Sequence, residues 1–173
     1  ASDVYKRQGN LSQLTSLTLN DNPLKAKIPE SLGNLALLEG LSFRNCQLIG
    51  TIPSSLGTLS NLGGLDVSNN KLTGPIPTTF AQLTNLRAFY VDRNKLTGVI
   101  PAGIGTFVPF QGTYLSFSCN AFTGSVEAYC DEVKDIPSGI DGFSYLTIDC
   151  PEVSCSCNPT LCQCEEYACN IAL

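Results

Sequence analysis

A 24-residue repeat is the feature of this chain that most constrains its fold. The segment LTLNDNPLKAKIPESLGNLALLEG begins at Leu17, and similar segments begin at Leu41, Leu65 and Phe89, each 24 residues after the last. A shorter copy, LSFSCNAFTGSVEAYC, begins at Leu115, 26 residues after Phe89. Such repeats are typical of architectures that stack one small unit on the next, so that each unit contacts only its neighbours. The sequence therefore predicts an elongated stack whose core runs along its length.

Each repeat begins with two apolar residues that are separated by one other residue. This alternation has the period of a β-strand, in which every second side chain lies on the same face. The five pairs are Leu17/Leu19, Leu41/Phe43, Leu65/Val67, Phe89/Val91 and Leu115/Phe117. We expect each pair to face inward from a short strand, with equivalent strands lying side by side.

Three further positions recur after the strand. An asparagine follows, where a buried amide can satisfy the backbone groups of a turn. A glycine four residues later favours unusual backbone angles, and an Ile-Pro pair then indicates extended backbone. The asparagines are Asn22, Asn70, Asn94 and Asn120, with Cys46 in that position in the second repeat. The glycines are Gly50, Gly74, Gly98 and Gly124, with Ala26 in the first repeat, and the prolines are Pro29, Pro53, Pro77 and Pro101.

These positions together resemble the plant-type leucine-rich repeats, whose pattern is LxxLxLxxNxLxGxIPxxLGxL, over residues 9–126. The resemblance implies an α/β solenoid, wound as a right-handed superhelix, that contains the five repeats identified above. It also implies short parallel β-strands on the concave face and 3-10 or irregular backbone on the outer side.

The concave face supplies the candidate binding residues. On each strand, the residue between the inward pair and the residue just after that pair are expected to lie on this face. They are Thr18, Asn20, Ser42, Arg44, Asp66, Ser68, Tyr90, Asp92, Ser116 and Ser118. Arg44, Asp66, Tyr90 and Asp92 follow one another on successive strands and are the candidates to anchor a ligand, because Tyr and Arg are frequent in binding hot spots. The alternative is an ordinary hydrophilic solenoid surface.

The composition argues against several functional classes. Histidine is absent, which removes the commonest general base and the commonest metal ligand. No catalytic or phosphate-binding motif stands in its place. Residues 1–124 carry a formal charge of +3, residues 125–173 carry −8, and neither part has the basic face that nucleic acids need. We therefore predict no enzyme, no cofactor, no metal and no nucleic-acid partner, and no apolar run is long enough to cross a membrane.

The first eight residues, ASDVYKRQ, match no part of the repeat pattern. They resemble the in-frame translation of a transposase adapter used in sequencing libraries, and such leftovers are excluded from fold reasoning. We expect residues 1–8 to be such a leftover, so that the natural N-terminus and further repeats are missing. The lack of a signal peptide then says nothing against secretion. Asn10 begins the sequon Asn-Leu-Ser and is a glycosylation candidate.

Nine cysteines remain to be assigned, six of them in residues 150–169. Cys46 lies inside the repeats, where a small buried thiol fits without a partner. The eight disulfide candidates are Cys119, Cys130, Cys150, Cys155, Cys157, Cys162, Cys164 and Cys169. The segment YLTIDC, residues 145–150, repeats the strand alternation and predicts a sixth strand. In register beside the fifth repeat, that strand would bring Cys119 and Cys150 within disulfide range, and Cys130–Cys150 is the rival pairing.

A metal site is the alternative for the end of the chain. The C-S-C and C-Q-C pairs present thiolates that can bind zinc or copper. Their spacing is not that of a structural zinc site, no histidine is present, and the surrounding charge is negative. An oxidising compartment also favours disulfides, so disulfides are the prediction here.

Residues 127–173 are expected to close the apolar end of the solenoid as an acidic, cysteine-rich cap. Over residues 127–169 they resemble the end of secreted leucine-rich-repeat proteins of diatoms, although the doubled cysteines of that family appear here as Cys-x-Cys. The predicted function is a non-catalytic module of an extracellular protein, secreted or at the cell surface, which binds a protein or peptide with or without glycans. A membrane tether elsewhere in a longer protein stays open. The alternatives are a secreted structural, surface-coat or adhesion protein, or an inhibitor of a foreign cell-wall hydrolase.

Overall fold

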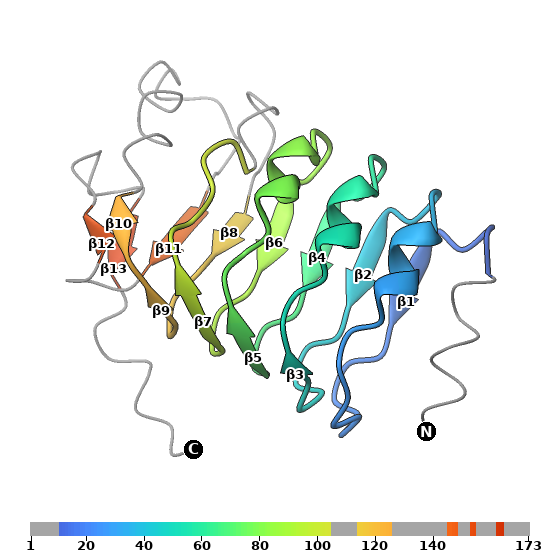
Figure 1. The fold of residues 1–173 in the computed structure, drawn as a ribbon, viewed down its shortest axis with the longest axis horizontal. Coiled ribbons are helices and arrows are strands. Elements are labelled where there is room, and N and C mark those ends of the chain that lie inside the picture. Colours follow the sequence, from blue (N-terminus) through green and yellow to red (C-terminus); the bar gives the residue numbers. More distant parts are fainter. Residues whose placement is uncertain (1–10, 105–113, 126–144, 149–152, 155–161, 165–173) are drawn as a thin grey trace.

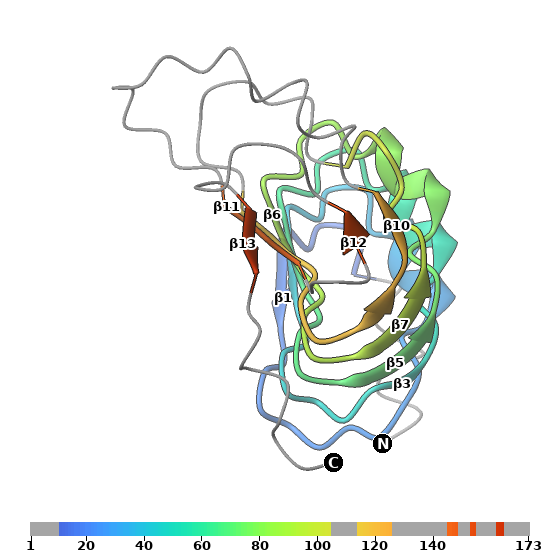
Figure 2. The same ribbon diagram turned by 90° about the vertical axis from the view of Figure 1, so that its left-hand side faces the viewer.

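The computed structural model describes residues 11–104, 114–125, 145–148, 153–154 and 162–164. These residues form a solenoid in which one repeat stacks on the next (Figure 1). The strands of one sheet line one side of the stack, and 3-10 helices, turns and a second row of short strands line the other (Figure 2). No helix in these ranges has the length and apolar character that a membrane crossing requires.

The main sheet is parallel and contains one strand from each of the five repeats, followed by two strands from residues 145–164. Its order is β1-β2-β4-β6-β8-β11-β13. The strands are β1 (Ser16–Thr18), β2 (Gly40–Ser42), β4 (Gly64–Asp66), β6 (Ala88–Tyr90), β8 (Tyr114–Ser116), β11 (Tyr145–Ile148) and β13 (Cys162–Cys164). The first apolar residues of the five repeats pair with one another from β1 to β8, so equivalent positions form straight columns across the sheet. The predicted solenoid with its parallel strands is confirmed.

The sixth strand is also confirmed, because β11 pairs with β8 and Leu146 lies opposite Leu115. The strand β13, with the sequence Cys-Gln-Cys, pairs with β11 and was not predicted. Its cysteine spacing indicated only a disulfide or metal loop, although the same spacing has the period of a strand. A further short pair joins β10 (Gly124–Ser125) to β12 (Val153–Ser154).

A second row of short strands follows the turn after each main strand. This lateral sheet has the order β3-β5-β7-β9. Its strands are β3 (Ile49–Gly50), β5 (Lys71–Gly74), β7 (Lys95–Gly98) and β9 (Ala121–Phe122). The 3-10 helices η2 (Glu30–Asn34), η3 (Ser54–Thr58) and η4 (Thr78–Gln82) come next. Each helix begins directly after a proline whose backbone is extended, as the Ile-Pro pairs predict.

The core lies between the main sheet and the 3-10 helices. The inward apolar residues of the second to fifth repeats are almost fully buried, as are the leucines of the helices. Four phenylalanines form a chain along the stack, with ring centroids 5.6 Å apart for Phe80–Phe89, 5.7 Å for Phe89–Phe117 and 6.0 Å for Phe117–Phe122. Full burial of each such side chain stabilises the fold by about 1.5–3 kcal/mol.

The recurrent asparagines satisfy the backbone of neighbouring repeats. The Asn70 side-chain oxygen accepts hydrogen bonds from the amides of Cys46 at 3.0 Å and Leu48 at 2.9 Å. Its Nδ2 donates to the carbonyls of Phe43 at 2.8 Å and Val67 at 2.9 Å. Asn94 and Asn120 make equivalent bonds one and two repeats further on. Each asparagine therefore ties its own turn to the turn of the repeat before it.

Two members of this series differ from the rest. Asn22 is exposed, and its side chain bonds among the described residues only within its own turn, to the carbonyls of Leu19 and Asn20, because no described repeat precedes it. Cys46 is free and buried, as predicted, and its thiol donates to the Leu19 carbonyl at 3.0 Å. Burial raises the pKa of this thiol, so it stays protonated and acts as a donor.

The glycines of the lateral turns adopt left-handed backbone angles. Gly50 has a φ of +81° and Gly74 a φ of +77°. The preceding repeat also lies close to these turns. A Cβ on Gly50 would stand 3.1 Å from Lys27 Cγ, and one on Gly74 would stand 3.1 Å from Thr51 Cγ2. Only glycine combines this φ with this space at low cost.

Candidate functional site

The main sheet presents three columns of residues on its concave side. The first column precedes the inward apolar residues and contains Ser16, Gly40, Gly64, Ala88 and Tyr114. The second column lies between the two inward residues and contains Thr18, Ser42, Asp66, Tyr90 and Ser116. The third column follows the inward pair and contains Asn20, Arg44, Ser68, Asp92 and Ser118.

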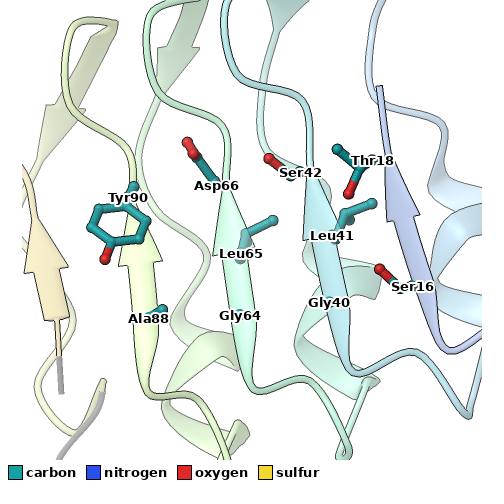
Figure 3. Close-up of a pocket in the computed structure, with 10 residues that line it drawn as sticks. All are labelled: Ser16, Thr18, Gly40, Leu41, Ser42, Gly64, Leu65, Asp66, Ala88 and Tyr90. Carbon is teal, nitrogen blue, oxygen red and sulfur yellow. The ribbon is translucent and has the colours of Figure 1, made fainter. Parts of the chain in front are cut away.

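A shallow depression of about 200 Å³ lies over strands β1, β2, β4 and β6. In Figure 3 the second-column side chains stand in a row beside the small residues of the first column. The residues that line the depression are Ser16, Thr18, Gly40, Leu41, Ser42, Gly64, Leu65, Asp66, Ala88 and Tyr90. The depression therefore crosses four repeats at right angles to the strands.

Two strand glycines keep the floor of the depression low. A Cβ added to Gly40 would meet only Ser16 Oγ, at 3.6 Å, and one added to Gly64 would meet only Ala88 Cβ, at 4.0 Å. Neither glycine has a positive φ. Nothing in the fold therefore requires glycine at these two positions, although glycine weakens a strand.

Asp66 supplies a fixed carboxylate on the rim. Its Oδ1 accepts hydrogen bonds from the Ser68 amide at 2.9 Å and from the Ser68 hydroxyl at 2.6 Å. Within the described residues the other carboxylate oxygen has no hydrogen bond and no ion-pair partner. The carboxylate is thus held in place through one oxygen, which leaves the second oxygen for a ligand.

Tyr90 stands beside Asp66 at one end of the row (Figure 3). Burial raises the pKa of its hydroxyl, and the negative charges of Asp66 and Asp92 raise it further. The hydroxyl is therefore neutral at physiological pH and can both donate and accept a hydrogen bond. Its ring offers an apolar and cation-binding face to the same space.

Asp92 lies two residues beyond Tyr90, in the third column. Burial raises the pKa of its carboxyl group, and a hydrogen bond from the Ser116 hydroxyl partly opposes that shift. The Arg93 Nε lies 3.9 Å from the carboxylate in a weak ion pair. This half-buried charge adds to the negative potential beside Tyr90.

The opposite end of the depression is held by a different network. The Asn20 side-chain oxygen accepts hydrogen bonds from the Ser42 hydroxyl at 2.7 Å and from the Arg44 amide at 2.8 Å. These bonds join β1 to β2 through predicted site residues. Thr18 and Ser42 line the depression, whereas the Arg44 side chain is exposed outside it.

A polar ladder borders the third column. Asn45 Nδ2 donates to Asp21 Oδ1 at 2.9 Å, and Asn69 Nδ2 donates to Asn45 Oδ1 at 3.0 Å. All three residues have positive φ, between 54° and 61°. The ladder links three repeats and stiffens the edge of the concave face.

The structure thus separates the predicted surface residues into groups. Thr18, Ser42, Asp66 and Tyr90 come together in one depression. Ser68 and Ser118 are buried, with 6% and 2% of their surface exposed, so the expectation that they lie open on the face does not hold. At Ser68 the reason is local, because its amide and hydroxyl turn back to Asp66.

Sequence reasoning missed the first column. The same two-residue alternation that selected the second column places the residue before each apolar pair on the same side of the sheet. Glycine at positions 40 and 64, directly before the predicted apolar pairs, was a further signal.

The other predicted sites fall mostly outside the described residues. Asn10 and most of the tail cysteines lie there, so the glycosylation and pairing predictions stay predictions. Cys119 is disulfide-bonded, to a partner that the described side chains do not include. In the described ranges, no three His, Cys, Asp or Glu residues lie close enough together to hold a metal ion.

Comparison with known proteins identifies relatives of the repeats. Residues 13–35, 37–59 and 61–83 match the model of the Leucine Rich Repeat family. No curated protein gives a significant match. A chain of the BIR3–SERK2 complex from Arabidopsis thaliana is 31% identical, with a TM-score of 0.61, and the match covers 86% of this chain and 72% of that one.

Two further solved structures are similar over much of this chain. A plant ice-binding protein is 30% identical with a TM-score of 0.67, and the match covers 84% of this chain and 43% of that one. The plant peptide hormone receptor RGFR1, solved in complex with RGF2, is 29% identical with a TM-score of 0.67, over 83% of this chain and 23% of that one. This chain therefore spans less than half the length of either protein.

Proposed function

The chain belongs to the leucine-rich repeat family, and on that premise we propose that it is a non-catalytic module that binds a protein or peptide through its concave face. We place it outside the cell, secreted or at the cell surface. Support comes from the similarity to a plant peptide hormone receptor solved in complex with RGF2. A chain of the BIR3–SERK2 complex, a protein–protein complex, is similar as well. The depression that crosses four repeats is the observation that carries the proposal.

The chemistry of the depression suits an extended peptide. Gly40 and Gly64 leave room for a peptide main chain to approach the sheet closely, which is a recognised use of glycine in a strand. The second-column hydroxyls and the Asp66 carboxylate provide hydrogen-bond partners along one side. Tyr90 provides an aromatic anchor of the kind that dominates binding energy at interfaces.

The test is selection of a displayed library of random peptides on the full chain, followed by affinity measurements on the enriched peptides. Tyr90→Ala is expected to weaken these peptides at least about tenfold, which is a typical hot-spot effect. Lys95→Ala, on the lateral sheet, serves as the control and is expected to leave the affinity unchanged. Equal affinity for wild type and Tyr90→Ala would place the binding site elsewhere.

A matched pair of glycine variants locates the peptide more finely. Gly64→Ala adds a methyl group to the floor of the depression. Gly63→Ala adds the same group one residue earlier in the chain, outside the lining of the depression, where the nearest atoms are carbonyl oxygens at 3.6 and 3.7 Å. Gly64→Ala is expected to weaken the peptide and Gly63→Ala is not. If no peptide is enriched on the wild-type chain, peptide recognition itself is contradicted.

A second candidate function, adhesion to an ordered surface, draws on the plant ice-binding protein. Thr73, Thr97 and Thr123 are exposed at equivalent positions along the lateral sheet, away from the depression. The strand register offsets these threonines, because Thr73 pairs with Lys95 and Thr97 with Ala121. Inhibition of ice recrystallisation by the wild type, and its loss in Thr73→Val/Thr97→Val, would support this second function.

A further inference from the structure

The lysines of the described chain gather on one face. They are Lys25, Lys27, Lys71 and Lys95, and all four side chains are exposed. Lys71 and Lys95 begin strands β5 and β7 of the lateral sheet. The Ile49 amide donates to the Ala26 carbonyl at 3.0 Å, so residues 25–27 lie alongside β3 at the edge of the lateral sheet. We call this set of lysines, with the threonines between them, the lysine face.

No acidic residue interrupts the lysine face. Its other exposed positions are Pro23, Ile49, Thr51, Thr73, Pro75, Thr97, Val99, Ala121 and Thr123. Within the described ranges the single ion pair joins Arg93 to Asp92, on the concave side. The four ammonium groups therefore have no carboxylate partner there, and their charges add to one positive potential.

The fold spaces these charges regularly. Ile49 pairs with Lys71 and Thr73 pairs with Lys95, so equivalent lysines are offset by two residues from one strand to the next. With about 4.8 Å between strands and about 3.3 Å per residue along a strand, the backbone positions of Lys71 and Lys95 lie roughly 8 Å apart. A threonine hydroxyl lies between them, because Thr73 is the direct neighbour of Lys95.

Lys27 is held onto the same face by the turn glycine of the next repeat. Its Cγ lies 3.1 Å from where a Cβ on Gly50 would stand, so the aliphatic stem crosses the glycine. Packing of the stem against the backbone leaves the ammonium group to reach outward. The Thr73 hydroxyl donates to the Gly50 carbonyl at 3.3 Å, which leaves its lone pairs to accept bonds from outside.

We propose that the lysine face binds a linear acidic polysaccharide, a chain of uronic-acid units, at a site separate from the concave depression. Like-facing carboxylates recur regularly along such a chain and can meet successive ammonium groups, while sugar hydroxyls bond to the threonines. The face has no aromatic side chain, which argues against the base stacking that single-stranded nucleic acids use. It also lacks the buried aromatic anchor of a protein hot spot.

The test measures binding of polygalacturonate to the full chain at low and at moderate salt. The wild type is expected to bind although its net charge is −5, and to lose affinity steeply as salt rises. Lys71→Gln/Lys95→Gln is expected to weaken binding at least about tenfold. Because both lysines are exposed and unpaired, their replacement is expected to leave the thermal midpoint unchanged.

The matched control removes the same charge elsewhere. Arg44→Gln/Arg87→Gln changes two exposed arginines outside the lysine face and is expected to keep wild-type affinity for polygalacturonate. An equal loss in the two double variants would overturn the proposal, as would equal binding of a neutral glucan or no binding at all. Binding to phosphatidylserine vesicles but not to polygalacturonate would assign the face to lipid surfaces instead. Self-association at low salt without polygalacturonate binding would assign it to a second copy of the chain.

Discussion

The glycines of the lateral turns and those of the concave face both recur from repeat to repeat, but the fold requires glycine in the turns and not on the concave face. Gly74 has a φ of +77°, and Thr51 Cγ2 lies 3.1 Å from the position of an added Cβ. Gly64 has no positive φ, and an added Cβ would meet only Ala88 Cβ at 4.0 Å. Glycine therefore allows a left-handed backbone conformation in the lateral turns, whereas on the concave face its lack of a side chain leaves the sheet surface accessible.

The largest effect is expected from Gly74→Val. The left-handed conformation costs an L-residue about 1–2 kcal/mol. The added side chain also crowds Thr51, and such overpacking costs about 1–3 kcal/mol more. We expect the free energy of unfolding, measured with denaturant, to fall by roughly 2–5 kcal/mol. The same change at Gly64 is the control and is expected to cause no loss, because Gly64 has no positive φ and an added Cβ meets only Ala88 Cβ, at 4.0 Å. Equal losses at the two positions would remove the distinction.

Gly50→Ala is expected to have an intermediate effect. The φ of +81° imposes the same backbone cost of about 1–2 kcal/mol. The atoms nearest to an added Cβ belong to the flexible Lys27 side chain, which can move aside. We therefore expect a smaller loss of unfolding free energy than in Gly74→Val, and Lys27→Ala/Gly50→Ala should separate the two contributions. A loss that disappears in the double variant would show that contact, and not φ, dominates.

The repeat fold could be predicted because each recurrent residue type meets one structural requirement of the repeat. Asn70 and Asn94 bond the backbone of the preceding repeat, and that requirement recurs at every turn. The depression could not be predicted in the same way, because Gly64 meets no requirement of the fold and its role depends on what its neighbours leave empty. Burial of Ser68 was equally hidden, since it follows from one local bond to Asp66.

The extra strand β13 illustrates a different limit. Cys162 and Cys164 were interpreted through the chemistry of sulfur, so their strand-like spacing carried no weight in the prediction. β11 was predicted because Leu146 and Ile148 repeat the apolar alternation of the earlier strands. The prediction succeeded for the leucine and isoleucine of β11, whose alternation indicates only a strand. It failed for the cysteines of β13, whose spacing fits both a strand and a disulfide or metal loop.

Gly64→Ala is expected to act in the opposite direction from the turn variants. Alanine restricts the unfolded chain more than glycine and fits the open space, so the free energy of unfolding should rise by about 0.4–1 kcal/mol. If the depression binds a peptide, the same variant gains stability while it loses affinity. Thermal unfolding and peptide titration of one sample measure both quantities. A drop in stability would show that the fold itself uses Gly64.

The smallest effect is expected from the pH dependence of Asp92. Burial raises the pKa of this carboxyl group above its unfolded value, so the folded state binds the proton more tightly. The stability of the wild type should therefore increase as pH falls through the folded pKa towards the unfolded value near about 3.9. Asp92→Asn has no such proton, so its stability relative to wild type should be highest at neutral pH and decline in acid. Thermal midpoints of both proteins across this pH range measure the difference. If the thermal midpoints of the two proteins change with pH in parallel, burial of the Asp92 carboxylate does not destabilise the fold. The concave face would then resemble the lateral face, where no charge is buried at a cost.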